Sequence, residues 1–551
     1  MVTLNTSFKR LKKLLGARIT LEELEEKLFQ YGMELDGVNG DELIIDITPD
    51  RADMVSPQGL ARALRPFLGL DSIKYKVKET KNKFIITKEL ASIRPFAVGA
   101  IVKNVNFTDD LIKEIIWVQE KLHATYCRNR RKAAIGIYPL DNIKFPVYFK
   151  AKSPKEIKFI PLDFNEELTG DEILKKHPTG IKYAHLINKF SKYPVLEDSE
   201  GKILSMPPII NSEIMGKVTK NTKDVFIEVT GTNLETVNQI LTLMATVIAH
   251  ETGIIEKLIT VLPNKEIKTP LLEGEKMSVV FNNVKELIGV ELTSGQIKRL
   301  LKMMDYEILS ETENDIIVKT PFYRTDILHE VDVIDDIARA YGFENIVPKM
   351  PSVSTTGGLR DETLFIEKLR DFMIGNGYLE EYTFALTTEE EQYKKMNVRI
   401  QPPHATVIEA KSPYYSLRTW VLPELLKCVE QNLHRDFPMK LFDIGEVVIP
   451  HEKYEVKAKN ELHLGVINVS DKAGYESIKK VFDALVETFD FKFELKKSNH
   501  DSFIQGRSAD IYYKNKKIGV MGELHPKVIT NFGIKLPVVA MEISFEDLNI
   551  Y

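Results

Sequence analysis

Four aspartates fall within eleven residues of this chain: Asp326, Asp332, Asp335 and Asp336. The last three recur at i, i+3 and i+4, with Arg339 at i+7, so we expect them to share one face of a helix. Magnesium favours such oxygen ligands and usually takes one or two carboxylates, with waters or substrate completing its shell. The same spacing is also typical of a solvated helix face on which Asp332 or Asp335 pairs with Arg339.

An apolar stripe runs beside these acids. Its helical spacing predicts a helix that is buried along one side and that ends at Gly342. Asp326 comes just before this helix, and we expect its carboxylate to bend over the first turn. The residues of the stripe are Ile327, Val331, Ile334, Ala338 and Tyr341.

A short basic run, residues 128–132, lies beside Tyr126. The formal net charge of −5 and the pI near 6.2 exclude a protein that holds RNA through a broad basic face, so any RNA contact has to be local. The run is the best candidate for such a contact. By itself, however, a five-residue basic run is more often a solvated loop than an RNA contact.

The length of 551 residues predicts three or four domains, because one hydrophobic core does not grow that large. Hydrophobic residues at 43% and charged residues at 28% describe an ordinary soluble globular protein. The two cysteines, Cys127 and Cys428, lie far apart, which argues against a disulfide framework and fits a cytoplasmic protein. Residues 237–250 are the most apolar run; they are too short to span a membrane and predict a buried helix.

The pattern of apolar residues and turn signals along the chain predicts a multidomain α+β protein with four domains. Residues 1–90 form a mixed N-terminal α+β domain. Residues 91–265 are strand-rich with interrupting helices. Residues 266–350 contain helices closed by a short hairpin, which is typical of a winged-helix-like module. Residues 359–551 alternate long helices with strands.

Two local patterns refine the N-terminal part. Thr20 and Glu23 have the spacing of a helix capping box. The lysine-rich residues 74–83 are predicted to form a linker.

Sequence motifs in order along the whole chain resemble the β subunit of phenylalanyl-tRNA synthetase, of the archaeal or eukaryotic type. The acidic segment matches almost residue for residue, and the order of the motifs is more specific than any one of them. The motifs are residues 48–53 (TPDRAD), 59–64 (GLARAL), 320–346, 412–426, 441–446 (LFDIGE), 506–510 (GRSAD) and 522–526 (GELHP).

The resemblance implies a magnesium ion, shared with an α subunit, on Asp326, Asp332, Asp335 and Asp336. It also implies an α2β2 tetramer that binds tRNA(Phe), in which the α chains use ATP to attach phenylalanine. The last domain is expected to have a class II synthetase-like antiparallel sheet without catalytic motifs. Its Arg-x-Glu sequence, residues 360–362, lies at a helix entrance, and no glycine-rich partner follows it.

Residues 91–265 resemble the editing domain of this family, which hydrolyses tyrosyl-tRNA(Phe) made in error. A pocket for phenylalanine rejects tyrosine only about a hundredfold, so a second sieve has to recognise the phenolic hydroxyl. A buried carboxylate is the strongest acceptor for that hydroxyl at neutral pH, and motif position assigns this role to Glu228. The other expected pocket residues are Thr230 and Ser205 in the lining, Leu196 against the ring, and Asn211 orienting the ester or the attacking water.

The same pattern has a structural interpretation, because a glutamate that alternates with Phe, Ile and Val usually faces solvent. One departure from the family pattern is Tyr138-Pro139, where other members often have His-Asp. Arg130 and Lys132, close by in sequence, are expected to contact the terminal phosphates of the tRNA.

Two other functions fit the sequence. The first is a structural and RNA-positioning subunit without editing activity. The second is a free-standing aminoacyl-tRNA hydrolase that holds RNA through its winged-helix-like module.

Overall fold

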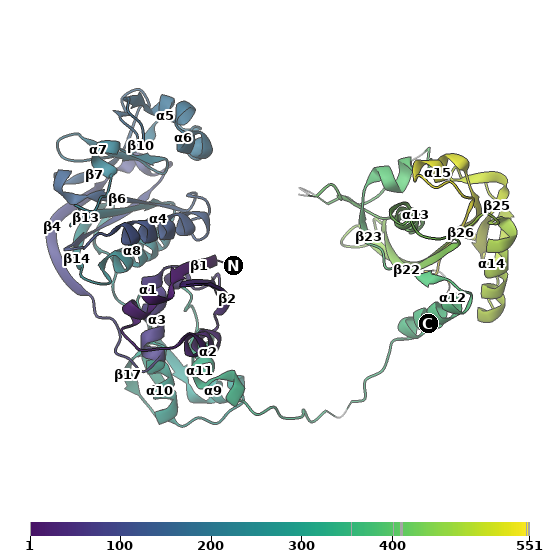
Figure 1. Ribbon diagram of the computed structural model, residues 1–551, viewed down its shortest axis with the longest axis horizontal. Coiled ribbons are helices and arrows are strands. Elements are labelled where there is room, and N and C mark those ends of the chain that lie inside the picture. Colours follow the sequence, from purple (N-terminus) through teal and green to yellow (C-terminus); the bar gives the residue numbers. More distant parts are fainter. Residues whose placement is uncertain (1, 354, 400–401, 408–411, 547, 549–551) are drawn as a thin grey trace. The chain divides into compact units, whose positions relative to one another are not determined.

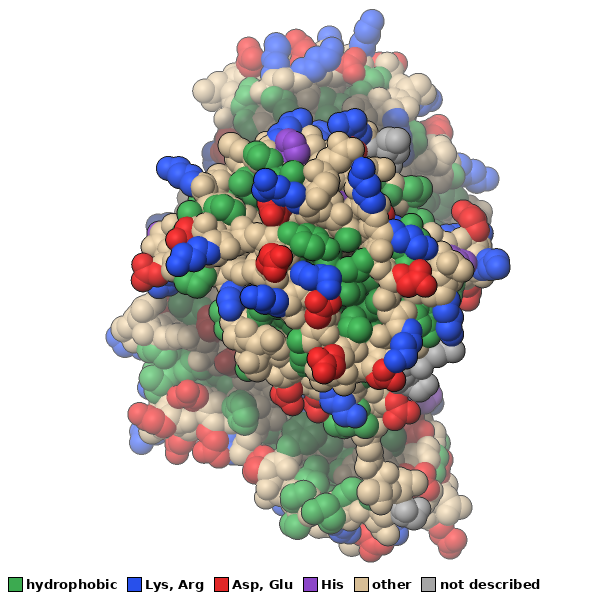
Figure 2. Space-filling model, turned by 90° about the vertical axis from the view of Figure 1, so that its right-hand side faces the viewer, with side chains coloured by type: hydrophobic (Ala, Val, Ile, Leu, Met, Phe, Trp, Pro, Cys, Tyr) green, Lys and Arg blue, Asp and Glu red, His purple; other side chains and the backbone are tan. Residues whose placement is uncertain are grey.

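The computed structural model describes residues 2–551, except 354, 400–401, 408–411, 547 and 549–551. The chain divides into two compact units, Met1–Met350 and Pro351–Tyr551 (Figure 1). Positive and negative side chains are intermixed on the face in Figure 2, which agrees with the small net charge. Among the described residues, no helix is long and apolar enough to cross a membrane.

The N-terminal segment forms a three-stranded antiparallel sheet, in the order β1-β3-β2, covered by three helices. Thr20 and Glu23 form the predicted capping box at the start of the second helix. The elements are β1 (Val2–Ser7), α1 (Phe8–Leu15), α2 (Leu21–Tyr31), β2 (Glu34–Asn39), β3 (Glu42–Ile47) and α3 (Pro57–Phe67).

Residues 276–341 form the predicted arrangement of helices with a short hairpin. Their sheet has the order β16-β18-β17. This segment and the N-terminal segment share one hydrophobic core, in which Leu4 and Leu60 lie with Leu301 and Ile334. The elements are β16 (Lys276–Val280), α9 (Phe281–Ile288), α10 (Ser294–Met303), β17 (Glu307–Glu311), β18 (Asp315–Lys319) and α11 (Glu330–Tyr341).

A ten-stranded sheet dominates the rest of the first unit. Its order is β12-β11-β10-β7-β4-β14-β5-β13-β6, with β15 paired to β14. Its strands are β4 (Lys76–Ile86), β5 (Phe96–Lys103), β6 (Ala133–Pro139), β7 (Val147–Lys152), β10 (Tyr193–Glu197), β11 (Ile203–Met206), β12 (Ile210–Asn211), β13 (Val225–Gly231), β14 (Ile254–Leu262) and β15 (Lys265–Thr269).

Two long helices, α4 (Asp109–Ala124) and α8 (Leu234–Ala249), pack on one face of this sheet (Figure 1). The predicted buried helix at residues 237–250 is therefore confirmed as part of α8. The shorter elements between β7 and β13 in the chain are β8 (Lys158–Phe159), β9 (Leu168–Thr169), α5 (Gly170–Lys176), α6 (Pro178–Tyr183) and α7 (Glu213–Gly216).

The predicted linker at residues 74–83 is wrong. Most of this segment belongs to β4, which pairs in parallel with β14 and continues into the buried residues Phe84 and Ile86. Its lysines lie on the exposed part of the strand, where apolar side chains are not required. The other boundaries of the four predicted domains stay a prediction.

The second unit is built on a seven-stranded sheet, in the order β19-β22-β23-β27-β26-β25-β24. All its pairs are antiparallel except β19 with β22, which agrees with the expected antiparallel domain. The strands are β19 (Leu379–Glu380), β22 (Met439–Pro450), β23 (Ala458–Val469), β24 (Glu494–Lys497), β25 (Phe503–Tyr513), β26 (Lys516–Leu524) and β27 (Val538–Ser544).

Helices of the second unit belong to two separate apolar cores. Phe365 and Leu485 contribute to one core, and Leu425 and Val528 to the other. The Arg-x-Glu sequence lies at a helix entrance as predicted, because α12 begins at Asp361. The remaining elements are α12 (Asp361–Gly375), β20 (Leu386–Thr387), β21 (Ser416–Leu417), α13 (Leu422–Gln431), α14 (Tyr475–Phe489) and α15 (Pro526–Asn531).

Candidate functional site

Glu228 lies near the middle of β13, between Gly99 of β5 and Gly136 of β6. Its side chain is only 2% exposed. The structural interpretation in which this glutamate faces solvent is therefore wrong. Gly136 leaves space around the carboxylate, because a Cβ there would lie 2.6 Å from Glu228 Oε1.

The two ends of the ten-stranded sheet meet at this carboxylate. Tyr138 lies on the edge strand β6, whereas Ser205 and Asn211 lie on β11 and β12 at the opposite end of the strand order. The Tyr138 hydroxyl donates to Ser205 Oγ at 2.8 Å, and it lies 3.1 Å from Glu228 Oε1 and 3.4 Å from Asn211 Oδ1. The sheet therefore curls until residues from its two edges share hydrogen bonds.

A cavity of about 440 Å³ opens at this junction. Glu228, Ser205 and Asn211 are three of its polar wall residues. Much of the remaining wall is apolar and comes from α4, β6 and the segment before β12. The apolar residues are Phe107, Ile112, Ile115, Ile116, Ala134, Ile135, Ile137, Leu162, Pro207, Pro208, Ile209, Ile210 and Val218.

Burial raises the pKa of Glu228 to about 7, because the ionised carboxylate loses hydration that its surroundings do not replace. The hydrogen bond from Tyr138 and the positive charge of Arg94 lower this pKa, but less than burial raises it. Glu228 Oε2 is buried and has no hydrogen-bond partner among the described residues. A buried oxygen without a partner is costly, so this atom is a candidate for binding a ligand.

Thr230 and Leu196 lie near this site but not in the wall of the cavity as the described residues define it. Thr230 Oγ1 accepts a hydrogen bond of 2.9 Å from Arg94, which also donates to the Thr230 carbonyl at 2.6 Å. Leu196 is opposite Ser205 in the β10–β11 ladder and is fully buried in the apolar core. Three of the five predicted pocket residues therefore come together in the wall of the cavity. The other two, Thr230 and Leu196, are buried outside this wall.

Sequence reasoning missed the buried Arg94 and the inward position of Tyr138. Arg94 is 136 residues from Thr230, and burial lowers its pKa to about 10. Tyr138 stood out in the sequence only as a departure from the family pattern. Its proximity to Ser205 could not be read from local spacing, because it depends on the closure of the sheet.

Arg130 and Lys132, the predicted RNA contacts, have different surroundings. The Arg130 guanidinium donates to the carbonyls of Ile209 at 2.9 Å and Pro208 at 3.3 Å, and lies 4.5 Å from the ring centre of Tyr183. It therefore supports the wall of the cavity. Lys132 is half-buried, with Nζ 5.6 Å from the ring centre of Tyr126. Binding of RNA by either residue stays a prediction.

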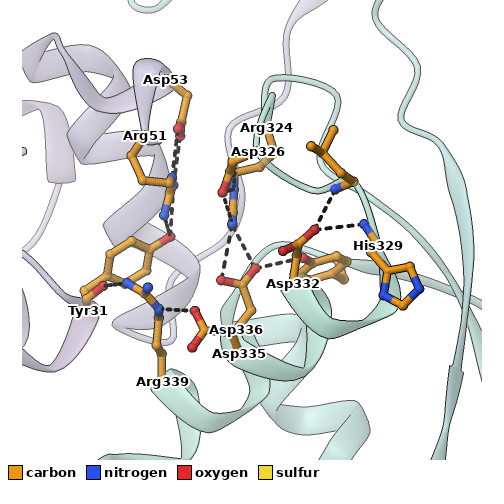
Figure 3. Close-up of polar contacts among 12 residues, drawn as sticks. Tyr31, Arg51, Asp53, Arg324, Asp326, His329, Asp332, Asp335, Asp336 and Arg339 are labelled. Atoms are coloured by element: carbon orange, nitrogen blue, oxygen red, sulfur yellow. Dashed lines mark hydrogen bonds and ion pairs between the residues drawn. The ribbon is translucent and has the colours of Figure 1, made fainter. Parts of the chain in front are cut away.

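The acidic segment forms a second cluster of buried polar groups (Figure 3). The Arg324 guanidinium lies between Asp326 and Asp336, with its shortest contacts at 2.7 Å to Asp326 and 2.8 Å to Asp336. Asp336 also accepts a hydrogen bond of 2.7 Å from Tyr306. Burial acts to lower the pKa of Arg324, but its two carboxylate partners together hold that pKa well above its usual value.

The remaining two aspartates have separate partners on the solvent side of α11 (Figure 3). Asp332 accepts the backbone N–H groups of Leu328 at 2.7 Å and His329 at 2.8 Å, so it caps the helix. Asp335 pairs with Arg339 at 2.7 Å, as the alternative interpretation of a solvated face predicted.

Two expectations for this helix are wrong. Asp336 is 2% exposed and does not share the face of Asp335, and Val331, expected in the buried stripe, is 48% exposed. The helix begins at Glu330, after Ile327, and it is rotated so that Val333 and Ile337 are buried with Asp336. The pairing of Asp336 with Arg324 makes this rotation possible.

The four carboxylates do not fit a metal ion in this arrangement. An arginine already lies between Asp326 and Asp336, and Asp332 and Asp335 are held by the helix start and by Arg339. Among the described residues, no group of three or more His, Cys, Asp or Glu side chains is arranged to hold a metal. The magnesium site stays a prediction.

Comparison with known proteins gives the class first. Residues 1–70 match the Phe-tRNA synthetase beta subunit B1 domain, residues 277–343 the tRNA synthetase B5 domain, and residues 346–545 the phenylalanyl tRNA synthetase beta chain CLM domain. These three matches, in this order along a multidomain α+β chain, place the protein among the aminoacyl-tRNA synthetases.

Individual relatives define the family. The chain is 38% identical to the phenylalanine–tRNA ligase beta subunit of Pyrococcus furiosus, over 98% of each chain, and 38% identical to that of Pyrococcus horikoshii, over the full length of both. A crystal structure of an N-terminal fragment of the Pyrococcus horikoshii subunit matches with a TM-score of 0.59 and 39% identity, covering 62% of this chain and 99% of the fragment. The chain belongs to the family of phenylalanine–tRNA ligase β subunits.

Proposed function

We propose that this chain hydrolyses mischarged tyrosyl-tRNA(Phe) in the cavity beside Glu228, while an α subunit attaches phenylalanine to tRNA(Phe) using ATP. The observation that carries the proposal is the unpaired, buried Glu228 Oε2 at a cavity of about 440 Å³. A volume of this order is typical of small-molecule sites. It accommodates a tyrosyl ring and the ester that joins it to the ribose.

Different residues of the cavity wall would recognise the ring and the hydroxyl of the tyrosyl group. Apolar side chains such as Ile112 and Ile135 suit an aromatic ring, and Glu228 offers an acceptor for its hydroxyl. A phenylalanyl group has no hydroxyl and would leave the buried carboxylate unpaired. A site built around a substrate hydroxyl discriminates strongly against the analogue that lacks it.

Hydrolysis in this cavity depends on a positioned water. His123 is part of the wall, but its Nε2 accepts the N–H of Ile135 at 2.9 Å and its Nδ1 lies 3.2 Å from Glu120, so neither ring nitrogen is free to act as a base. Asn211 is placed to orient the water or the ester. The water oxygen bonds to the ester carbonyl carbon, the bond from that carbon to the ribose oxygen breaks, and a water proton passes to the ribose oxygen. The neighbouring ribose hydroxyl assists this proton transfer.

The second unit supports association with an α chain in an α2β2 tetramer. Tyr382 and Phe384 are 94% and 82% exposed, although large aromatic side chains are usually buried or located at interfaces. Magnesium has no step in this proposal, because the four carboxylates predicted to bind it are already paired with Arg324, with Arg339 or with the start of the helix.

The decisive experiment measures deacylation of tyrosyl-tRNA(Phe) by the complex of this chain with its α partner. Glu228→Ala should lower the rate by roughly tenfold to hundredfold, the effect of losing a hydrogen bond to a charged group, and should leave aminoacylation unchanged. Glu235→Gln is the matched control, because this exposed glutamate on α8 belongs to the same part of the chain.

The other two functions predict different results. A structural subunit without editing would leave wild-type tyrosyl-tRNA(Phe) intact, and the α pocket alone would then account for accuracy. A free-standing hydrolase would be equally active as a monomer without any α chain. Loss of hydrolysis in Glu228→Ala, with the control active and aminoacylation intact, would exclude the structural subunit; activity of wild type only with its α partner would exclude the hydrolase.

A further inference from the structure

The hydroxyl of the chain's own Tyr138 already contacts groups that are expected to recognise a substrate phenol. Its hydroxyl contacts Ser205, Asn211 and Glu228, which are three of the five residues expected to form the tyrosyl pocket. A phenol has one hydrogen and can donate to one acceptor at a time. The three acceptors therefore converge on a group of the same chemistry as the tyrosyl side chain.

The space around Tyr138 has the shape of a phenol-binding socket. At the hydroxyl end, Gly136 provides room: a Cβ there would lie 2.2 Å from the Tyr138 hydroxyl. At the ring, Phe226 stacks on Tyr138 with centroids 5.9 Å apart, and Phe84 and Phe145 pack edge-on against Phe226. Tyr138 is fully buried there. The socket is thus apolar around the ring and polar only at the hydroxyl.

We propose that Tyr138 is a specificity-determining residue that acts as a resident competitor: the hydroxyl of a tyrosyl group in the cavity competes with the Tyr138 hydroxyl for Ser205, Asn211 and Glu228 Oε1, and only Glu228 Oε2 is open to it without competition. This inference rests on the proposed deacylation and deepens it. The cavity and the socket share these three residues, so a ring that enters from the cavity and the Tyr138 ring compete for one set of acceptors. A phenylalanyl ring has no hydroxyl with which to compete for these acceptors.

The first test fills an emptied socket with a small molecule, using the α–β complex. Tyr138→Gly removes a complete p-cresol unit, so p-cresol should raise the melting temperature of this variant and should bind roughly tenfold to hundredfold tighter than toluene, which lacks the hydroxyl. Wild type should bind both molecules more weakly, because its socket is occupied and only the cavity is open to them.

Phe84→Ala is the matched control. It removes an aromatic ring from the same apolar core, away from the three polar residues. Any cavity that it leaves should bind p-cresol and toluene without this preference. Equal binding of the two molecules by Tyr138→Gly, or binding of p-cresol by wild type as strong as by this variant, would overturn the inference.

The second test uses Tyr138→Phe, which keeps the ring and removes only the hydroxyl. Because the acceptors that Tyr138 occupies are then free for the substrate hydroxyl, the KM for tyrosyl-tRNA(Phe) in deacylation should fall roughly tenfold, with aminoacylation by the α chain unchanged. An unchanged or higher KM would contradict the inference, and this variant does not require a large cavity to be tolerated.

The two tests separate the inference from the proposed function. Absence of deacylation in wild type and in both Tyr138 variants would refute the proposed function, and the resident-competitor role would fall with it, whatever p-cresol does. Deacylation that depends on Glu228, without any change of KM in Tyr138→Phe and without preference for p-cresol, would refute the competitor role alone.

Discussion

Glu228 and Asp336 are both 2% exposed, yet their surroundings are opposite. Asp336 receives two N–H groups of Arg324 and the hydroxyl of Tyr306, so both of its oxygens are paired within the chain. Glu228 has only the Tyr138 hydroxyl within hydrogen-bond reach of Oε1, and its Oε2 has no partner among the described residues. The first carboxylate is satisfied by the fold, whereas the second is left to interact with something else.

This difference changes which acidic residues deserve functional attention. Four clustered aspartates are conspicuous in the sequence, but the structure uses them to hold a helix and to join it to Arg324. A single glutamate in an apolar strand is inconspicuous, but its burial without a cation donor is energetically unfavourable unless a ligand compensates. Perturbed, incompletely paired groups in a cavity are more often functional than paired ones.

The largest expected effect comes from removing Arg324, the cation that pairs with the satisfied carboxylate Asp336. Arg324→Leu leaves Asp326 and Asp336 without their cation and should lower the free energy of unfolding by about 3–5 kcal/mol, the usual result of removing one partner of a buried ion pair. Urea denaturation of the first unit's transition, followed in the full chain, measures this loss. Arg339→Leu is the control, because its exposed pair with Asp335 contributes about 0–1 kcal/mol.

An Arg324→Leu variant as stable as Arg339→Leu would mean that the buried cluster is not a structural ion pair. Tighter magnesium binding by the full-length Arg324→Leu chain than by wild type, measured by titration calorimetry, would indicate that the arginine occupies the place of a cation. Unchanged magnesium binding would leave the cluster with a structural role only.

A smaller effect is expected in the pH dependence of the unfolding free energy, because of the unsatisfied carboxylate of Glu228. Because burial raises the pKa of Glu228 from 4.5 to about 7, the folded chain holds this proton where the unfolded chain has lost it. Stability from this group is therefore complete below about pH 4.5 and is lost as pH rises through about 7, by about 3 kcal/mol in total. Glu228→Gln cannot ionise, so the difference in unfolding free energy between variant and wild type should increase by this amount from pH 4 to pH 9.

Glu235→Gln again provides the reference for this titration, since it removes an exposed carboxylate from the same region. A pH-independent difference between Glu228→Gln and wild type would mean that Glu228 ionises as readily in the folded chain as in the unfolded one. Glu228 would then no longer differ from Asp336 as a buried carboxylate whose ionisation the fold makes unfavourable.

The sequence predicted those parts of the molecule that depend on local pattern. The capping box of Thr20 and Glu23, the buried helix over residues 237–249 and the end of α11 before Gly342 were predicted, because apolar periodicity and capping act over a few residues. The predicted linker failed because β4 carries few apolar residues and pairs with β14, about 180 residues away. Pairing partners so distant leave no local signal.

The candidate site was predictable to the same extent. Motif resemblance located Glu228, Ser205 and Asn211, which the structure brings to one cavity. It could not locate Tyr138 in their midst, because that contact exists only when the two edges of the sheet meet. The burial of Asp336 was missed for the same reason, since it requires Arg324 and Tyr306 from other segments.

The smallest expected effect extends the comparison to cations. The two terminal nitrogens of the Arg130 guanidinium are engaged by backbone carbonyls and by Glu120, as the oxygens of Asp336 are engaged, although its Nε is buried without a partner among the described residues. Lys132, half-buried beside Tyr126, corresponds to the available Glu228. Lys132→Ala should remove one phosphate contact and reduce the slope of log K for tRNA(Phe) against log salt by about 0.7, the value for a single strand.

Arg130→Ala should leave this slope unchanged and lower the melting temperature, because the wall at Pro208 and Ile209 loses its donors. Filter binding of tRNA(Phe) at several salt concentrations distinguishes the two residues, and a reduced slope for Arg130→Ala with none for Lys132→Ala would reverse their assignment.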